Sequence, residues 1–329
     1  MERVEAAPLR LKPVLITALA LLLGALVGIT LLDRLPEAPK QGRLAVAQLS
    51  PSTEILAVGS SHIYTAIDPA LTGRPWVNLS AGLMNYVFMD AVIAAHLERA
   101  PNLHAVLLDF DPLPAFTDSY GSAKGDFRHL LDLAPSFSAL DESLSRKLVL
   151  GRDHLFMYDL PFRRAFMHEK ADFDTVHRLR GEDWSKISPG HQALQGMHEG
   201  GFHGAERAEG HYRVMYDTQY MPRNLAAFAR IIARVKAAGV PLILVRIPVH
   251  ASYRDASPPE FAQAFAALEA RAREASPDAP LPVLDYTREP AFGDDEFFDG
   301  DHLNQLGAAR LTPRLAADVR DLLQSTLAR

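Results

Sequence analysis

Short apolar runs alternate with segments of helical periodicity in two parts of the chain, and this alternation restricts the possible folds more than any other feature. The runs are almost wholly apolar, as strands covered on both faces are; they lie at about 53–58, 76–79, 104–110, 241–247 and 281–284. Helical patterns begin near 86, 222, 259 and 305. The sequence therefore predicts an α/β fold, a doubly wound, flavodoxin-like sheet of about five parallel strands.

Some helix boundaries can also be predicted. Gly239 lies where a C-terminal cap belongs. Ser257 to Glu260 has the pattern of a capping box, with proline at the first helical position. Pro313 is expected to kink or restart the last helix, with Thr312 as its cap.

The alternation stops between about 112 and 220, and we expect one long insertion over the carboxyl edge of the sheet. Four histidines stand in its last part, between several glycines: His191, His198, His203 and His211. Their spacing is irregular and no cysteine accompanies them, which favours a solvated loop over a metal site. We predict no metal and no cofactor.

Residues 14–32 are nineteen consecutive residues without a charge. At about 1.5 Å per residue, such a helix nearly spans a hydrocarbon core of about 30 Å. No small-residue cleavage site follows, so we predict an uncleaved transmembrane signal anchor at 14–32, a cytoplasmic tail at 1–13, a linker at 33–52 and an α/β domain at 53–329. Arg10 and Lys12 beside the run favour a cytoplasmic N-terminus. The domain would then lie outside the cytoplasmic (inner) membrane, in the periplasm of a Gram-negative cell.

The composition narrows the chemistry. Apolar residues make up 48% of the 329, enough for a large core. The net charge of -6, without a long basic run, argues against nucleic acid as a partner. The absence of cysteine excludes disulfides and a thiol nucleophile.

Two segments at opposite ends of the domain hold the parts of a serine nucleophile system. Ser61 follows the first expected strand, and Asp299 and His302 share one late loop. A serine hydroxyl needs a base within about 2.6–3.2 Å, and the base needs an orienting group. We predict Ser61 as nucleophile, His302 as base and Asp299 as the residue that orients the base. The backbone N–H of Ser61, at a strand-to-helix turn, would help to hold the oxyanion.

Several alternatives stay open. The two serines could form only a turn with a helix cap. His62 could be the base in place of His302. Separately, Asp301 could be the residue that orients the base, in place of Asp299. At the same edge, Asp111, Arg246 and His250 are candidate substrate-binding residues, or they could be structural.

Three blocks of the sequence together resemble the SGNH (GDSL-type) hydrolase superfamily. They are Gly59-Ser60-Ser61, the stretch 77–82 (VNLSAG), and the stretch 298–304 (FDGDHLN) followed by Gly307-Ala308. The resemblance implies an SGNH-type sheet, Ser61 as nucleophile, and the N–H of Gly82 in the oxyanion hole. The third block departs from the family pattern, because residues 108–112 (LDFDP) lack its asparagine. The oxyanion hole would then rest on the backbone of Ser61 and Gly82.

An N-terminal anchor with variant SGNH blocks resembles a membrane-anchored branch that includes the alginate O-acetylation and teichoic-acid D-alanylation proteins. The resemblance implies a serine-dependent O-acyl esterase or acyltransferase. It would act through an acyl-enzyme on a cell-envelope polysaccharide or another acyl ester, with a polytopic membrane acyltransferase as partner. The missing asparagine and the long insertion favour the alternative, a non-catalytic SGNH-like binding or assembly protein.

Overall fold

The computed structural model describes residues 19–20, 23–24, 49–82, 84–117, 194–198, 201–216, 218–288 and 292–327. The chain divides into two compact units, one of Met1–Ala38 with Ser136–Lys170, the other of Pro39–Pro135 with Ala171–Arg329. All described residues from 49 onward belong to the second unit. Nearly all of the predicted anchor and linker, and the insertion from 118 to 193, lie outside the described residues. Within the described ranges, no helix combines the length and apolar character needed to cross a bilayer.

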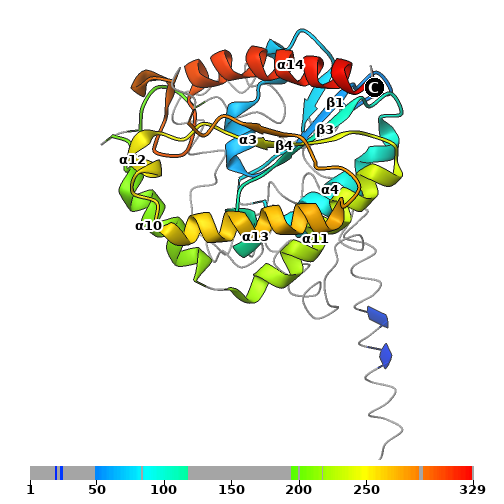
Figure 1. Cartoon of the computed structure of the whole chain (residues 1–329), viewed down its shortest axis with the longest axis horizontal. Helices are drawn as coiled ribbons and strands as arrows, with labels where there is room; N and C mark the ends of the chain where they lie inside the picture. The colour runs from blue at the N-terminus through cyan, green and yellow to red at the C-terminus, as the bar shows by residue number, and fades with distance from the viewer. Residues whose placement is uncertain are drawn as a thin grey trace, which may run out of the picture. The chain divides into compact units, whose positions relative to one another are not determined.

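Five parallel strands form one sheet in the order β2-β1-β3-β4-β5 (Figure 1). Their bounds are β1 Ile55–Val58, β2 Trp76–Asn78, β3 Ala105–Asp109, β4 Leu242–Arg246 and β5 Val283–Asp285. Ile55 of β1 pairs with Trp76 of β2 on one side and with Ala105 of β3 on the other. The predicted α/β class is confirmed, and the strand order is compatible with a flavodoxin-like fold.

Helices cover both faces of the sheet, which explains why its inner strands are apolar except for the last residues of β3 and β4, Asp109 and Arg246. On one face lie α3 (Ser61–Ala66) and α14 (Gln305–Leu327); on the other lie α4 (Tyr86–His96), α11 (Met221–Ala237) and α13 (Pro259–Ala275) (Figure 1). Alternate strand residues such as Ala57 and Leu107 form a buried cluster with Leu311 and Leu315 of α14. The shorter elements are η1 Pro69–Leu71, η2 Leu97–Arg99, α5 Leu113–Phe116, α10 Gly204–Met215, η5 Thr218–Tyr220, α12 Ala251–Arg254 and η6 Asp294–Glu296.

One of the three helix-boundary predictions is confirmed and two need correction. Gly239 follows α11 with φ +70°, as a C-terminal cap requires. The predicted capping box of α13 is wrong: Pro258 holds the cap position, and the hydroxyl of Ser257 donates to the Tyr253 carbonyl instead. Helix α14 runs through Pro313 without a break, so Thr312 caps nothing.

Helix α10 corrects the expectation of a solvated, histidine-rich loop. It begins at Gly204 and buries Ala208 and Met215, within the range assigned to the insertion. A side chain on Gly300 would meet the Cα of Gly204 at 2.6 Å. This close approach places the start of α10 directly against the loop that carries the predicted base.

Candidate active site

The hydroxyl of Ser61 lies 2.8 Å from Nε2 of His302. On the other side of the same ring, Nδ1 lies 3.0 Å from Oδ1 and 3.1 Å from Oδ2 of Asp299. Ser61 and His302 are partly exposed, whereas Asp299 is buried. The structure thus brings the three predicted catalytic residues into hydrogen-bond contact, with the hydroxyl and the ring accessible and the carboxylate shielded from solvent.

The turn after β1 fixes the position of Ser61. A side chain at Gly59 would collide with Ile63 and Asp109, so the strand can approach α3 this closely only with glycine there. Ser60 is the N-cap of α3, and its hydroxyl accepts from the N–H of His62 at 3.4 Å. Ser61 is consequently the first helical residue, at the carboxyl edge of the sheet.

Two backbone amides near Ser61 bear on the predicted oxyanion hole. Within the described part of the chain, no residue accepts a hydrogen bond from the N–H of Ser61. The N–H of Ala81 donates to the carbonyl of Gly59 at 3.2 Å. This bond holds the turn that carries Gly82 beside the turn that carries Ser61.

The loop of Asp299 and His302 is closed by its own backbone. The N–H of Phe298 donates to the His302 carbonyl at 2.9 Å, below an antiparallel bridge between Phe297 and Leu303. Oδ1 of Asp299 accepts from the N–H groups of Asp301 at 3.1 Å and His302 at 2.9 Å. Two backbone N–H groups therefore hold the Asp299 carboxylate in the position from which it contacts the imidazole of His302.

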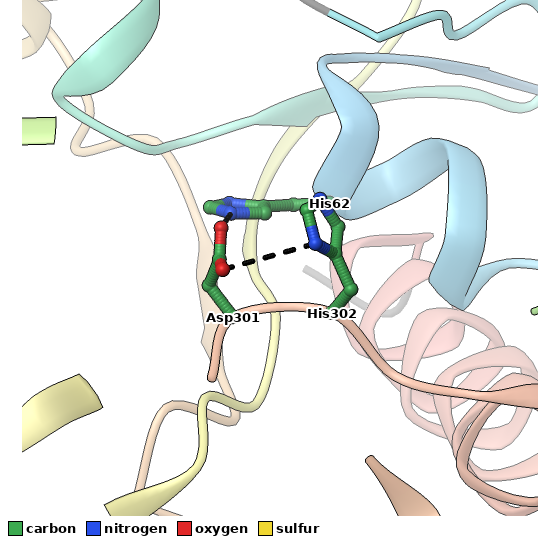
Figure 2. Close-up of side chains that lie close together, drawn as sticks. All are labelled: His62, Asp301 and His302. Atoms are coloured by element: carbon green, nitrogen blue, oxygen red, sulfur yellow. Dashed lines mark hydrogen bonds and ion pairs between the residues drawn. The ribbon is translucent and has the colours of Figure 1, made fainter. Parts of the chain in front are cut away.

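Asp301, one residue before the base, lies between two imidazole rings. Figure 2 shows its carboxylate beside His62 and His302. Oδ2 lies 3.1 Å from Nε2 of His62, and Oδ1 lies 3.7 Å from Nδ1 of His302. The rings of the two histidines are 5.4 Å apart and meet edge to face. His62 therefore contacts Asp301, and the ring that contacts the Ser61 hydroxyl is that of His302.

Arg207 of α10 completes this arrangement from the other side. Its guanidinium forms a fork on Asp301, with Nε on Oδ1 and Nη2 3.0 Å from Oδ2. Its Nη1 lies 3.3 Å from Oδ2 of Asp299. One cation therefore bridges the two carboxylates of the loop.

The electrostatics of these buried groups follow from their neighbours. Burial alone would lower the pKa of His62, but the carboxylates of Asp301, Asp111 and Asp109 outweigh it and raise that pKa to about 9. Burial alone would raise the pKa of Asp301, but His302, His62 and Arg207 hold that pKa well below its usual value. His211 has no such excess of carboxylates, and burial lowers its pKa to about 4. The site thus holds charged His62 and neutral His211 at neutral pH.

Asp109 is the last residue of β3, and it faces Ser60. Its Oδ2 accepts from the Ser60 N–H at 2.9 Å and from the Ser60 hydroxyl at 2.5 Å. Burial and the nearby charge of Asp111 raise the pKa of Asp109 to about 6, although His62 and the Ser60 hydrogen bonds act against the rise. Its role is to hold the turn before the nucleophile.

The three candidate substrate-binding residues have different surroundings. Asp111 faces the site: Oδ2 lies 3.6 Å from Nδ1 of His62, and its side chain is 28% exposed. Arg246 pairs with Asp285 at 2.7 Å and covers the Phe265 ring. His250 caps α12, and its Nε2 lies 3.1 Å from Asp294. The described side-chain contacts of Arg246 and His250 are therefore with other residues than Ser61, although the N–H of His250 donates to the Gly300 carbonyl in the loop of Asp299 and His302.

The side chains that could ligate a metal ion in this cluster already have other partners. Ligand atoms of His62, Asp301 and His302 lie within 4.8 Å of one another. Both oxygens of Asp301 are already engaged by Arg207 and His62, which supply the positive charge that a metal would bring. We assign no metal to these residues.

The histidines of the insertion do not converge either, among those that the structure describes. The rings of His198 and His203 pack together, whereas Nδ1 of His211 lies 2.8 Å from the Tyr253 hydroxyl. His191 lies outside the described residues. The histidine-rich stretch is therefore no shared ligand set in the described part.

Sequence reasoning missed Arg207 and Tyr253, and it placed His211 in a solvated loop rather than in α10. Arg207 and His211 are four residues apart, on one face of α10, and both approach Asp301. That spacing is the one signal that could have indicated them. It was hidden because the glycines around it favoured a loop.

No protein-family model matches the chain, and no curated protein matches it.

Proposed function

We propose that the protein is a serine-dependent O-acyl esterase or acyltransferase that works through an acyl-enzyme at Ser61. The observation that supports this most directly is the 2.8 Å contact between the Ser61 hydroxyl and Nε2 of His302, with Asp299 on the opposite ring nitrogen. Such an order of alcohol, imidazole and carboxylate is the arrangement that activates a serine hydroxyl.

The reaction would proceed in two halves. His302 takes the proton of Ser61 while the hydroxyl oxygen attacks the ester carbonyl, and Asp299 stabilises the ring that becomes charged. His302 then protonates the leaving alcohol, and the acyl group stays on Ser61. In the second half, water or a sugar hydroxyl loses its proton to His302 and attacks the acyl-enzyme. Water gives hydrolysis and a sugar hydroxyl gives transfer.

The tetrahedral oxyanion would be held by backbone N–H groups of Ser61 and Gly82. The carboxylates that replace the family asparagine are occupied in other directions, Asp109 by Ser60 and Asp111 by His62 and the N–H of Leu113. Their negative charges therefore have partners and need not oppose the oxyanion. A single oxyanion donor typically contributes about 100- to 1000-fold to the rate, so a backbone-only hole can still support turnover.

The family and the cellular setting belong to the same proposal. The sequence blocks now fall at one edge of a parallel sheet with the 2-1-3-4-5 order, which fits an SGNH-type hydrolase. With the apolar run at 14–32 as a membrane anchor, the domain would work outside the inner membrane. Its substrate would be an acylated envelope polysaccharide or a related acyl ester, and its partner a polytopic membrane acyltransferase.

A fluorophosphonate probe and an activated acetyl ester test the chemistry together. We expect stoichiometric labelling at Ser61 and ester turnover in the wild type. In Ser61→Ala both should vanish, with thermal stability nearly unchanged because Ser61 is partly exposed.

Ser325→Ala removes an exposed hydroxyl of α14 and is the matched control, which should keep both activities. Full turnover in Ser61→Ala would exclude Ser61 from the mechanism. Absence of both labelling and turnover in the folded wild type would favour the non-catalytic binding protein.

A further inference from the structure

Arg207 reaches the candidate active site from α10, a helix that the three sequence blocks do not include. Its side chain is about one-third exposed, and its guanidinium contacts Asp301 through a fork and Asp299 through Nη1. Planar guanidinium groups recognise carboxylates in this two-point manner, which a lysine cannot reproduce. The contact therefore fixes the position of a full positive charge beside the base.

Nη2 of Arg207 also lies 3.4 Å from Nδ1 of His302. If Nδ1 carries the proton that Asp299 accepts, both nitrogens are donors, and this approach is a repulsive contact rather than a hydrogen bond. When His302 takes the proton of Ser61, the ring becomes a cation next to another cation. Arg207 therefore acts against the charged form of the base.

The other titratable groups around His302 come from its own loop and from the helices packed against that loop. Asp299 and Asp301 lie on its own loop and favour the charged ring. His62 of α3 lies 5.4 Å away by ring centroids and, because Asp301 and Asp111 face its two nitrogens, adds a second positive charge. His211 of α10 lies 3.8 Å from Asp301, and the hydroxyl of Tyr253 in α12 lies 2.8 Å from Nδ1 of His211.

We infer that Arg207 is a positioning residue that keeps His302 in its proton-accepting form although two carboxylates flank the ring, and so sets the lower pH limit of the reaction. This inference rests on the proposed function. Its physical basis is the balance of charges around the ring, where Asp299 and Asp301 place two carboxylates. Arg207 offsets them and also holds the Asp299 carboxylate in place.

The test is the pH dependence of the second-order rate of fluorophosphonate labelling, which reports the free enzyme. In Arg207→Met the acid limb should move to higher pH by roughly one to two units, the shift that a charge at this distance produces. Arg207→Lys keeps the charge without the fork. It should leave the acid limb in place and lower the plateau.

Arg213→Met is the matched control, because Arg213 lies on the same helix in an exposed pair with Glu209. It should change nothing. If Arg207→Met does not fold, Arg207→Gln, which keeps donors for Asp301 without the charge, makes the same measurement.

A lower plateau with an unmoved acid limb in Arg207→Met or Arg207→Gln would overturn the inference and leave the proposed function standing. Equal shifts of the acid limb in Arg207→Met and Arg207→Lys would also overturn the inference. Labelling of Ser61→Ala at the wild-type rate would refute the proposed function itself.

Discussion

The imidazole of His62 is a titratable group near Ser61 whose pKa is strongly raised by its surroundings. It is buried, and carboxylates of Asp301 and Asp111 face its two nitrogens at 3.1 and 3.6 Å. A ring in this position is stable as a cation, because each N–H then points at a negative charge. His62 thus forms an ion pair with Asp301 and Asp111, whereas the Ser61 hydroxyl contacts His302.

This ion pair predicts how stability depends on pH. The pKa of His62 is raised from 6.5 to about 9 in the folded state. The stabilisation is therefore complete below pH 6.5 and is lost as the pH rises through 9. At about 1.4 kcal/mol per pKa unit, the difference between 6.5 and about 9 corresponds to a loss of at most about 3.5 kcal/mol. Denaturant unfolding of wild type and His62→Gln between pH 6 and 10 measures it; the two stability curves should converge at high pH, and parallel curves would contradict the assignment.

The residues of the serine system could be predicted because each sits in a short motif with a chemical purpose. Ser61 follows a strand, and Asp299 and His302 share one loop. Arg207 could not be predicted in this way, since its role depends on where α10 packs, and its four-residue spacing from His211 does not show that. Arg246 and His250 show a different limit of sequence reasoning. Arg246 ends β4 and His250 follows it at the carboxyl edge of the sheet, as predicted, but the side chain of each contacts a carboxylate, Asp285 or Asp294, that no motif indicated.

Helix α14 is joined to the nucleophile helix by one buried hydroxyl. Thr312, expected to be a cap, donates to the Ala66 carbonyl at 3.2 Å and accepts from the Asp68 N–H at 3.1 Å. Both partners belong to the end of α3 and the turn after it. The two helices on this face of the sheet are thus tied together by hydrogen bonds as well as by apolar packing.

Thr312→Val should therefore destabilise the fold although threonine and valine have side chains of nearly the same size. Valine keeps the shape but leaves both backbone groups of the α3 turn without their partner, which costs about 1–3 kcal/mol. Thr312→Ser is the control: it keeps the hydroxyl and loses one methyl, worth about 1 kcal/mol. Urea midpoints of the two variants compare them, and a valine variant as stable as the serine variant would show that these bonds contribute little.

The strands could be predicted because wholly apolar runs between helical patterns have few other interpretations. The helix starts were harder. The predicted capping box at Ser257 does not form because the Ser257 hydroxyl donates to the Tyr253 carbonyl. Helix α10 was not predicted because glycine-rich segments favour loops. Gly204 is there because Ser252 and Tyr253 leave no space for a side chain, not because the chain must bend. A glycine required by tertiary packing cannot be distinguished from a loop glycine by sequence alone.

The expected membrane anchor at 14–32 concerns the chain as a whole. A nineteen-residue uncharged run should keep the full-length protein in the membrane fraction after washing with high salt and carbonate. In spheroplasts of a Gram-negative host, protease added outside should degrade the α/β domain. Replacing Leu22 and Leu26, near the middle of the run, by arginine should release the protein from the membrane fraction, because each charge costs about 2.5–3.5 kcal/mol there. Complete extraction of the wild type by carbonate would contradict the anchor.

Ser61 and His302 are separated by 241 positions in the chain. At roughly 5–20 residues per second, a ribosome needs about 12 to 50 s to add the imidazole after the alcohol. During that interval the growing polypeptide would carry the proposed nucleophile without its proposed base, so a domain translocated during synthesis would cross the membrane in an inactive form. On the proposed function, activity would begin only after translocation, when the late loop folds back onto the first strand.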